Sequence, residues 1–587
     1  MATREPYVVD HVVMHRTATA NVLVIGTGAA GWRAAIAATQ AGVQPRMVAK
    51  RASSDAHTVL ASGGINAALG TRDPDDSWQQ HFADTVREGY LLGDPRRVET
   101  MARESPDAVL ELATWGCEFA RTADGQLDQR YFGAHRWRRT CYAGDFTGRA
   151  ILRTVAGKGA ELGIQVEEDQ YVSRLLVADG TCFGAVAFDL HTGDRTVHLA
   201  DAVVLATGGH TRLWRRSSSR RDENDGDGMR LALDAGCRLM DMELVQFHPT
   251  GMVAPEEAAG TLVTEAVRGE GGRLFNASGE RFMERYDPVR LELSSRDRVA
   301  LANYTEIVEG RGGPHGGVFL DITHLGKEHI SEKLPRMYRQ FIEWQMLDIS
   351  RQPMEVAPTA HYTMGGIVVD PESHSTSVRG LFAAGECVGG LHGANRLGGN
   401  SLGEALIAGR RAGAAAATYA LEGEKFVRSR RTIDDALAEL DALTRPGAEL
   451  GRPLQRRVRD MMWDKCGVVR TESGLREGLR ELAAIGQAAP DVDVRPSAEG
   501  WADLAHALDL QAMLVAAEAT LRCAIERRET RGAQIRSDFP ELDPRLQVNF
   551  HIDSRMEPWS EPVPPVPVEL REWVDRPVEI SAERLLE

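Results

Sequence analysis

Residues 21–31 read Asn-Val-Leu-Val-Ile-Gly-Thr-Gly-Ala-Ala-Gly, and an alanine-rich stretch follows them to Gln40. The part before Gly26 has the pattern of a short apolar strand. Gly26, Gly28 and Gly31 have the spacing of the G-x-G-x-x-G turn that joins a strand to a helix. In such a unit the helix N-terminus offers unpaired N–H groups to the pyrophosphate of a dinucleotide. The stretch therefore predicts an α/β dinucleotide-binding domain.

The end of the next strand helps to define the nucleotide. An NAD-binding unit usually carries Asp or Glu there, about twenty residues after the glycines, to bind the ribose. Here the segment Met47-Val-Ala-Lys50 ends on lysine. This departure disfavours a simple NAD dehydrogenase.

Two further segments, 201–209 and 380–386, have the pattern of buried strands that run into glycine turns. Together with residues 21–25 they predict one nucleotide domain assembled from separated parts of the chain. The block at about 246–354 has its own strand and helix signals, including a helix at 337–347, and is predicted to be an inserted lobe. A cleft between this lobe and the nucleotide domain would then hold the site.

The last third of the chain changes to helical periodicity. Helices are predicted at 433–443, 453–466, 472–485 and from Trp501 to about Arg528. From Arg536 the chain is proline-rich with mixed strand character, which predicts a tail that wraps around other domains.

A second glycine-rich turn, His392-Gly-Ala-Asn-Arg-Leu-Gly-Gly-Asn-Ser-Leu402, stands before a predicted buried helix at 403–420. Arg396, Ser401 and Leu402 would then lie on a turn ahead of a helix N-terminus, where unpaired N–H groups and the helix dipole favour negative charge. The planar fork of Arg396 suits a carboxylate. Taken alone, the pattern also fits a structural turn with a surface arginine.

Composition limits the classes of partner and compartment. The chain has 587 residues and a net charge of −16, which argues against nucleic acid or an anionic membrane surface as a direct partner. No apolar run approaches the roughly 20 residues of a membrane span, and residues 1–20 lack the apolar core of a signal peptide. Seven scattered cysteines without a Cys-x-x-Cys pair fit a reducing cytoplasm and predict no iron–sulfur cluster or other metal site on this chain.

Polar residues recur beside glycine and proline turns. His57 and Thr58, with Gly63 and Gly64 after them, follow the second strand, where the isoalloxazine end of a dinucleotide could reach; a solvated loop histidine is the alternative. The lobe and its return path contribute a second set: His248, Thr264, Glu265, Arg268, Arg296 and His361. Cationic and neutral donors in this number suit a small dicarboxylate, although most arginines in such loops form surface ion pairs.

Together these blocks resemble one family, the flavoprotein subunit of succinate dehydrogenase and fumarate reductase, from about Asn21 to Pro540. The matching blocks are the G-x-G-x-x-G turn, the His-Thr-Val…Gly-Gly block, 248–251, 264–272, the Arg296-Asp297 pair, 361–366, 383–386 and 392–402. The resemblance implies an α/β fold with a Rossmann-like FAD-binding domain, an inserted α+β capping domain, a C-terminal helical domain and an extended tail. The expected boundaries are 1–245 and 355–428 for the FAD-binding domain, 246–354 for the capping domain, 429–535 for the helical domain and 536–587 for the tail.

The resemblance also implies the cofactor residues. His57 matches the histidine to which FAD is covalently attached, a bond that raises the flavin's potential. The further implied FAD contacts are Gly26, Gly28, Ala29, Ala30, Gly31, Lys50, Thr58, Gly63, Gly64, Asp225, Glu386, Ser401 and Leu402. Among these, Lys50 would lie near the adenosine, and Ser401 and Leu402 would place N–H groups near flavin N1 and O2.

The implied substrate residues follow the same comparison. His248, Thr264, His361 and Arg396 match the ligands of the two substrate carboxylates. Arg296 matches the proton donor or acceptor, and Glu265 and Arg268 match its proton relay. Because arginine stays protonated in nearly every setting, such a relay is needed for it to exchange protons.

The leading hypothesis is therefore a succinate and fumarate oxidoreductase subunit with covalent FAD. It would pass electrons to an iron–sulfur subunit bound to membrane anchors, and would lie peripherally on the cytoplasmic side of the cell membrane. Two alternatives remain: an L-aspartate oxidase, whose family binds FAD non-covalently, and a flavin-binding subunit that has lost catalysis.

Three segments depart from the family pattern. The usual Thr-Thr-Asn run is replaced by the basic, serine-rich segment 214–221, for which we expect a solvated loop without function; FAD contacts at 210–224 are therefore not predicted. Gln534 stands where the family has histidine, and the segment from Asp543 replaces an acidic stretch. These last two departures affect a region that often contacts the iron–sulfur partner.

Overall fold

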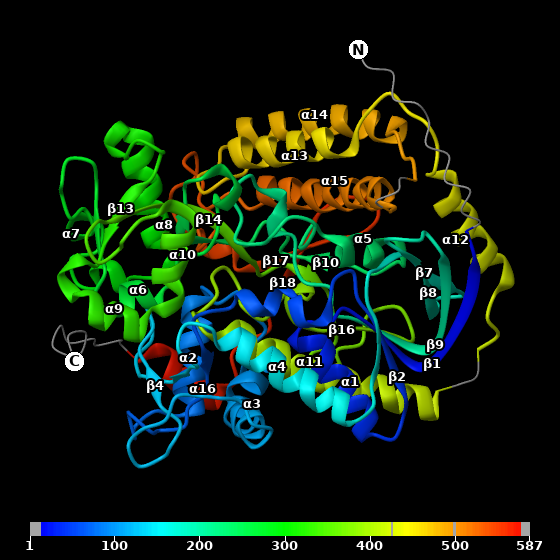
Figure 1. Ribbon diagram of the computed structural model, residues 1–587, viewed down its shortest axis with the longest axis horizontal. Coiled ribbons are helices and arrows are strands. Elements are labelled where there is room, and N and C mark those ends of the chain that lie inside the picture. Colours follow the sequence, from blue (N-terminus) through cyan, green and yellow to red (C-terminus); the bar gives the residue numbers. More distant parts are fainter. Residues whose placement is uncertain (1–12, 424–425, 497–499, 577–587) are drawn as a thin grey trace.

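The computed structural model describes residues 13–423, 426–496 and 500–576. The start of the expected first domain segment and the end of the expected tail, residues 1–12 and 577–587, lie outside this range. Figure 1 shows a mixed α/β core, a lobe at one end that contains β12–β14 and α6–α10, and a layer of long helices over the core. The expected fold class is confirmed.

The core sheet joins strands from separated parts of the chain. Its order is β6 (Gln165–Glu167), β2 (Pro45–Val48), β1 (His15–Ile25), β9 (Arg195–Leu205), β8 (Thr181–Asp189) and β7 (Gln170–Ala178), and β16 (Leu381–Ala383) also pairs with β9. β1 is parallel to both of its neighbours, β2 and β9. Its register with β9 runs from His15 opposite Arg195 to Ile25 opposite Leu205. β1 is thus longer than the apolar strand predicted at 21–25, because β9 also pairs with the more polar residues from His15 to Ala20.

Two helices that follow the glycine-rich turns pack against this sheet. They are α1 (Ala29–Gln40) and α11 (Asn400–Glu422), with α4 (Thr147–Glu161) beside α1. Glycines bring α1 and α11 close together: a Cβ on Gly409 would lie 2.3 Å from the Ala30 carbonyl oxygen, and one on Gly413 would lie 2.1 Å from that of Ala34. The two glycine-turn segments of the sequence are therefore held side by side.

The inserted lobe has its own antiparallel sheet and core. The sheet order is β11 (Val245–Met252), β14 (Met354–Thr363), β13 (Val318–Asp321) and β12 (Arg273–Phe275). The surrounding helices are α6 (Ala266–Gly269), α7 (Met283–Tyr286), α8 (Arg296–Glu306), α9 (Lys327–Lys333) and α10 (Pro335–Gln345). Side chains such as Val299, Leu320 and Phe341 are fully buried between them. β11 and β14 carry the chain into and out of the lobe, so residues on them face the core domain.

The helices predicted after residue 430 are confirmed. They are α12 (Arg430–Ala442), α13 (Gly451–Lys465), α14 (Glu472–Ala488) and α15 (Ala502–Glu526). α15 is buried along most of its length, with α13 and α14 above it (Figure 1). No helix in the described ranges has the length and apolarity that crossing a membrane requires.

The tail returns to the core domain. β17 (Val548–Ile552) pairs with β18 (Trp559–Pro562) and with β10 (Leu239–Met240), which also pairs with β15 (Gly366–Ile367). An unpredicted helix, α16 (Val568–Asp575), packs on α2 (Trp78–Glu88). The remaining elements of the core domain are α3 (Pro95–Thr114), α5 (Asp227–Asp234) and a small sheet of β3 (Ile65–Asn66), β5 (Thr140–Cys141) and β4 (Gln129–Arg130).

The start of α11 also differs from the sequence prediction. Ser401 and Leu402 were expected on a turn ahead of the helix, but α11 begins at Asn400, so both lie in its first turn. Gly399, with φ of 86°, makes the left-handed bend in front of it. The buried Asn400 side chain has polar partners in Asn66, His81 and Thr85.

Candidate active site

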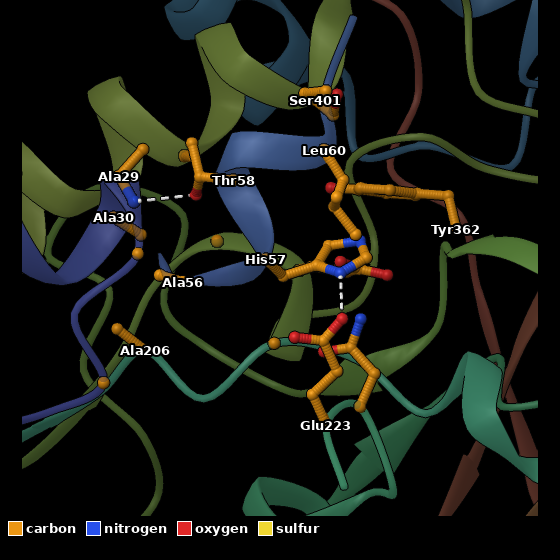
Figure 2. A pocket seen from close by; sticks show the side chains of 18 of the residues that line it. Ala29, Ala30, Ala56, His57, Thr58, Leu60, Ala206, Glu223, Tyr362 and Ser401 are labelled. Atoms are coloured by element: carbon orange, nitrogen blue, oxygen red, sulfur yellow. Dashed lines mark hydrogen bonds and ion pairs between the residues drawn. The ribbon is translucent and has the colours of Figure 1, made fainter. Parts of the chain in front are cut away.

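A cavity of about 270 Å³ runs between the core domain and the lobe. It begins at the first glycine turn and passes His57 (Figure 2). It ends among the arginines and histidines predicted to bind substrate: His248, Arg296, His361 and Arg396. The predicted residues that line it are Gly26, Gly28, Ala29, Ala30, Lys50, His57, Thr58, Gly63, Gly64, His248, Thr264, Glu265, Arg296, His361, Glu386, Arg396, Ser401 and Leu402. Tertiary folding thus gathers almost the whole predicted set along one elongated space.

The glycine turn forms a tight cradle at one end. A Cβ on Gly26, which has φ of 110°, would lie 2.2 Å from the Ala206 carbonyl oxygen. A Cβ on Gly31 would lie 2.0 Å from the Gly26 carbonyl oxygen, so Gly31 serves packing and does not line the cavity. The Ala29 N–H donates to Thr58 Oγ1 at 3.1 Å, which ties this turn to the His57 segment. A dinucleotide pyrophosphate fits this cradle, because small residues line it and it lies at the N-terminus of α1.

Lys50 lies farther along the same wall of the cavity. Its ammonium is paired with carboxylates of this chain. Its Nζ is 3.1 Å from Asp227 Oδ2 and 2.7 Å from Asp509 Oδ1. Burial favours the neutral amine, yet the two carboxylates outweigh it and raise the pKa of Lys50 above its ordinary value. Asp225, predicted as an FAD contact, does not line the cavity, whereas Asp227, two residues on, does. Both Asp225 carboxylate oxygens are buried behind the wall, and Arg459 lies 3.7 Å away.

His57 lies in the middle of the cavity wall on a short 3-10 turn, His57–Leu60. Its Nδ1 is 2.9 Å from Glu223 Oε1 (Figure 2). Burial disfavours the charged imidazole, but Glu223 raises the pKa of His57 above its ordinary value. Glu223 belongs to segment 210–224, for which the sequence left FAD contacts open. The expectation of a solvated serine-rich loop is wrong for Ser217, Ser218 and Ser219, which are buried.

The far end of the cavity holds a buried chain of charges. Arg296 Nε donates to Glu265 Oε2 at 2.7 Å, and Arg268 Nη2 lies 3.7 Å from Glu265 Oε1. Burial raises the pKa of Glu265, but Arg296 and Arg268 lower it to about 2, so this carboxylate is ionised at neutral pH. Arg268 does not line the cavity and reaches it through Glu265. Of the two predicted relay residues, Glu265 therefore contacts Arg296 directly, and Arg268 contacts Glu265.

Arg396 stands opposite Arg296 and has a different environment. Gln246, which sequence analysis did not select, accepts from Arg296 Nη1 at 3.0 Å and from Arg396 Nη2 at 3.1 Å. The Arg396 guanidinium lies 4.4 Å from the centre of the Tyr362 ring, and its Nε is buried without a hydrogen-bond partner. No described carboxylate lies within ion-pair distance of Arg396. Burial, together with repulsion from Arg296, lowers the pKa of Arg396 to about 9.

Two histidines face each other between these arginines. The rings of His248 and His361 are 5.1 Å apart between centroids and inclined by 65°. Burial, then nearby positive charge, lowers the pKa of both well below the ordinary value, so both are neutral. The Thr250 backbone N–H donates to His248 Nδ1 at 3.3 Å, and Ser218 Oγ lies 2.9 Å from His361 Nδ1. With Nδ1 occupied in this way, Nε2 of each ring is available to the cavity.

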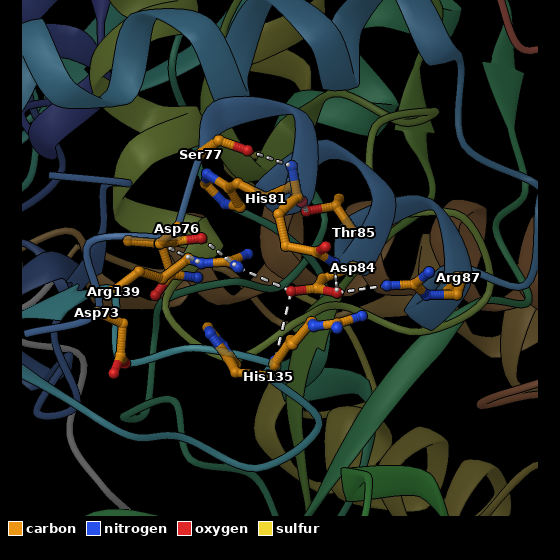
Figure 3. Close-up of polar contacts among 12 residues, drawn as sticks. Asp73, Asp76, Ser77, His81, Asp84, Thr85, Arg87, His135 and Arg139 are labelled. Atoms are coloured by element: carbon orange, nitrogen blue, oxygen red, sulfur yellow. Dashed lines mark hydrogen bonds and ion pairs between the residues drawn. The ribbon is translucent and has the colours of Figure 1, made fainter. Parts of the chain in front are cut away.

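A buried polar network supports the second glycine turn from behind. Asn400 Oδ1 accepts from Asn66 Nδ2 at 2.7 Å and lies 2.8 Å from His81 Nε2, while His135 Nε2 is 2.9 Å from the Gly398 carbonyl oxygen. Figure 3 shows both histidines beside a buried cluster of charges, in which Arg139 pairs with Asp76 and Asp84. The first turn of α11, with Ser401 and Leu402, is thus held from behind.

A larger groove of about 1050 Å³ adjoins the cavity. The two share Leu60, Ser218, Asp222 and Leu262. Nine arginines and four acidic residues line the groove: Arg212, Arg215, Arg216, Arg220, Arg221, Arg336, Arg452, Arg456, Arg459, Asp222, Glu256, Glu257 and Asp460. The groove beside the cavity is therefore basic, on a chain whose net charge is −16.

Comparisons with known proteins agree with this geometry. Residues 21–402 match the family described as FAD binding domain, and residues 455–574 match the fumarate reductase flavoprotein C-terminal family. A fumarate reductase (CoM/CoB) subunit from Methanothermobacter marburgensis is 42% identical over 540 residues, 92% of this chain and 98% of that protein. The succinate dehydrogenase flavoprotein subunit of Rickettsia bellii is 38% identical over 545 residues, 89% of this chain and 90% of that one.

A solved structure gives the same result. Mycobacterium smegmatis Sdh1 in complex with UQ1 is 41% identical, with a TM-score of 0.83, over 93% of this chain and 95% of that chain. The match to the FAD-binding family includes the glycine cradle, His57 and Arg396, so the cavity lies within the part of the chain that the family model assigns to FAD binding. The chain belongs to the FAD-binding flavoprotein subunits of the succinate dehydrogenase and fumarate reductase family of oxidoreductases.

Proposed function

We propose that this chain interconverts succinate and fumarate with FAD covalently attached to His57. The single observation that carries the proposal is the far end of the cavity, where Arg296, Arg396 and two neutral histidines converge beyond His57. FAD, when bound, supplies the hydride acceptor or donor. The glycine turn, Thr58 and the first turn of α11 would hold it.

Arg396 is the main carboxylate ligand in this proposal. It is a buried cation with a free Nε and without a carboxylate partner in the described chain, and such a charge is costly until a ligand compensates it. The Nε2 atoms of His248 and His361, with the Thr264 hydroxyl, are neutral donors for the remaining carboxylate oxygens. One cation and several neutral donors suit a small dianion better than a nucleotide.

Arg296 exchanges the proton in this proposal. A hydride leaves or joins one methylene carbon, and Arg296 takes or gives the proton at the adjacent carbon. Glu265 holds the Arg296 guanidinium by Nε at 2.7 Å and by Nη2 at 2.6 Å, so its orientation is fixed. Arg268 then continues the path behind Glu265. Polarisation of both carboxylates lowers the barrier for the C–H bond or the double bond.

Electron transfer would involve other subunits. The relatives are named as subunits, and one solved relative is described in complex with UQ1. We propose that electrons pass to an iron–sulfur subunit held by membrane-anchor subunits, with this chain peripheral on the cytoplasmic side.

The test is an anaerobic mixing experiment. Purified protein is mixed with succinate, and flavin absorbance is followed; the experiment is repeated with L-aspartate. Bleaching by succinate alone is expected. Bleaching by L-aspartate, with peroxide formed when oxygen is admitted, would instead indicate an L-aspartate oxidase. Absence of bleaching by either compound, in protein that contains FAD, would indicate a subunit without this catalysis.

A further inference from the structure

Glu223 is the carboxylate against which the His57 imidazole rests. Its side chain is only 8% exposed and lies 2.9 Å from His57 Nδ1. An ionised carboxylate only accepts, so Nδ1 carries the proton. Nε2, the other ring nitrogen, has no hydrogen-bond partner among the described residues. The contact therefore fixes both the ring orientation and the tautomer of this histidine.

A second interaction fixes Glu223 itself. The Arg220 backbone N–H donates to Glu223 Oε1 at 2.7 Å, and Arg220 Nη2 donates to Oε2 at 2.9 Å. The same guanidinium binds the Asp55 carbonyl oxygen at 2.6 Å and also pairs with the Asp55 carboxylate. Asp55 is two residues before His57. The segment that carries Glu223 is thus fastened to the segment that carries His57 by two independent links.

We propose that Glu223 is a positioning residue for covalent attachment of the flavin at His57, and that it keeps the attached imidazole positively charged. The inference rests on the proposed attachment. In that step the Nε2 lone pair forms a bond to the flavin methyl carbon. One C–H bond of that methyl group breaks, and its hydrogen and electron pair move to the flavin ring, which becomes the reduced anion. The Nδ1 proton stays on the imidazole, opposite Glu223.

The retained charge has a consequence for redox chemistry. A cation beside the flavin stabilises the reduced, anionic ring and makes its midpoint potential less negative. Glu386 and Glu223 favour that charge on His57, while burial and the cation of Arg220 oppose it. His361, also near, is neutral. Glu223 is the nearest of these groups, so its substitution should remove the largest favourable contribution.

The experiment compares the wild type with Glu223→Gln, Glu223→Asp and a control, Glu161→Gln, which alters an exposed carboxylate on α4. Acid-precipitated protein is examined for flavin fluorescence and for the mass of attached FAD. We expect Glu223→Gln to retain non-covalent FAD but to lose covalent flavin by at least tenfold, with partial recovery in Glu223→Asp. The covalent fraction that remains should have a more negative midpoint potential.

The outcomes separate the inference from the function on which it rests. A wild type without covalent FAD would refute the attachment itself. A Glu223→Gln protein with the wild-type covalent fraction and potential would refute the role of Glu223 alone. If this variant binds no FAD at all, the inference is also wrong, because Glu223 would then be needed for folding or binding. Far-UV circular dichroism of each variant distinguishes a loss of folding from a loss of FAD binding.

The basic groove carries a second, independent inference. Arg216 lies in it with its guanidinium 5.6 Å from the Trp463 ring centre, and no described carboxylate is within ion-pair distance of it. Arg212 has a buried Nε without a partner, and burial with repulsion from Arg459 lowers its pKa to about 10. Cations without compensating acids beside a cavity attract anions and raise their local concentration.

We infer that this groove is an access route that attracts dicarboxylate dianions to the cavity, which also rests on the proposed function. Stopped-flow mixing measures the association rate of malonate from the change in flavin absorbance, for Arg216→Gln and for Arg430→Gln, an exposed arginine of α12. At low ionic strength we expect a threefold or larger decrease for Arg216→Gln and none for Arg430→Gln. The difference should vanish in high salt. A salt-independent decrease would refute attraction, while a wild type that binds no dicarboxylate would refute the function instead.

Discussion

Replacement of Arg396 by glutamine should weaken catalysis and stabilise the substrate-free protein at the same time. The pKa of Arg396 is lowered to about 9 from 12.5, chiefly by burial. That difference corresponds to about 5 kcal/mol against the charged form, which is an upper bound on what the substitution relieves. A dicarboxylate that pairs with this cation recovers part of the same energy.

The expected loss of activity follows from the loss of this pair. Truncation of one partner of a buried, hydrogen-bonded charge pair costs about 2–5 kcal/mol. For Arg396→Gln this predicts a decrease in kcat/KM of roughly 30- to 5000-fold, since each 1.36 kcal/mol is tenfold. The assay is succinate oxidation with an artificial electron acceptor, with the FAD content of each preparation measured separately.

Thermal unfolding supplies the second readout. Removal of an uncompensated buried cation should raise the unfolding temperature of the substrate-free protein, with Arg430→Gln unchanged as the control. Dicarboxylate affinity of the wild type should also fall as pH rises through about 9, because Arg396 then loses its proton. A variant with kcat/KM within threefold of the wild type, or with a lower unfolding temperature, would refute the assignment of Arg396 as an unpaired carboxylate ligand.

Further predictions concern the proton path and the packing behind the cofactor. Arg296→Lys should abolish turnover while FAD stays bound; retained activity would exclude Arg296 as the proton donor. Glu265→Gln leaves two buried arginines uncompensated and should lower the free energy of unfolding in urea by about 3–5 kcal/mol at pH 7. Because the folded pKa of Glu265 is lowered to about 2, that difference should shrink as pH falls from about 4.5 towards 2, and a constant difference would contradict it. Gly413→Val should separate α11 from α1 and lose FAD, whereas Gly157→Ala, where an added Cβ meets nothing within 4 Å, should retain it.

The sequence predicted the main elements because their signals are local. The apolar strand at 21–25, the glycine spacing after it and the helical periodicity after residue 430 each lie within a short window. The site residues were found by their motifs, and the cavity brings most of them together. The errors at element ends arose from contacts between segments distant in sequence. β1 extends back to His15 because β9 pairs with it, and α11 begins at Asn400 because a folded network holds that side chain.

Residues outside the motifs could not be found in this way. Gln246 bridges two arginines that are 100 positions apart, and Glu223 meets His57 across 166 positions. Asp225 was predicted as an FAD contact, but it does not line the cavity, whereas Asp227, which was not selected, does. A hydrogen-bond partner is chosen by the packing of distant segments, and a single sequence carries no direct signal of that packing.

By itself, then, the sequence determined the strand–turn–helix unit, the helical C-terminal part and the motifs that match a flavoprotein family. Apolar periodicity and glycine spacing express short-range geometry, and short-range geometry is written along the chain. The tertiary structure alone decided which charges are compensated: Lys50 by this chain's own carboxylates, Arg396 by none that is described, His57 by Glu223. The physical reason is that burial and Coulomb interactions depend on distance in space, and folding sets that distance between residues hundreds of positions apart.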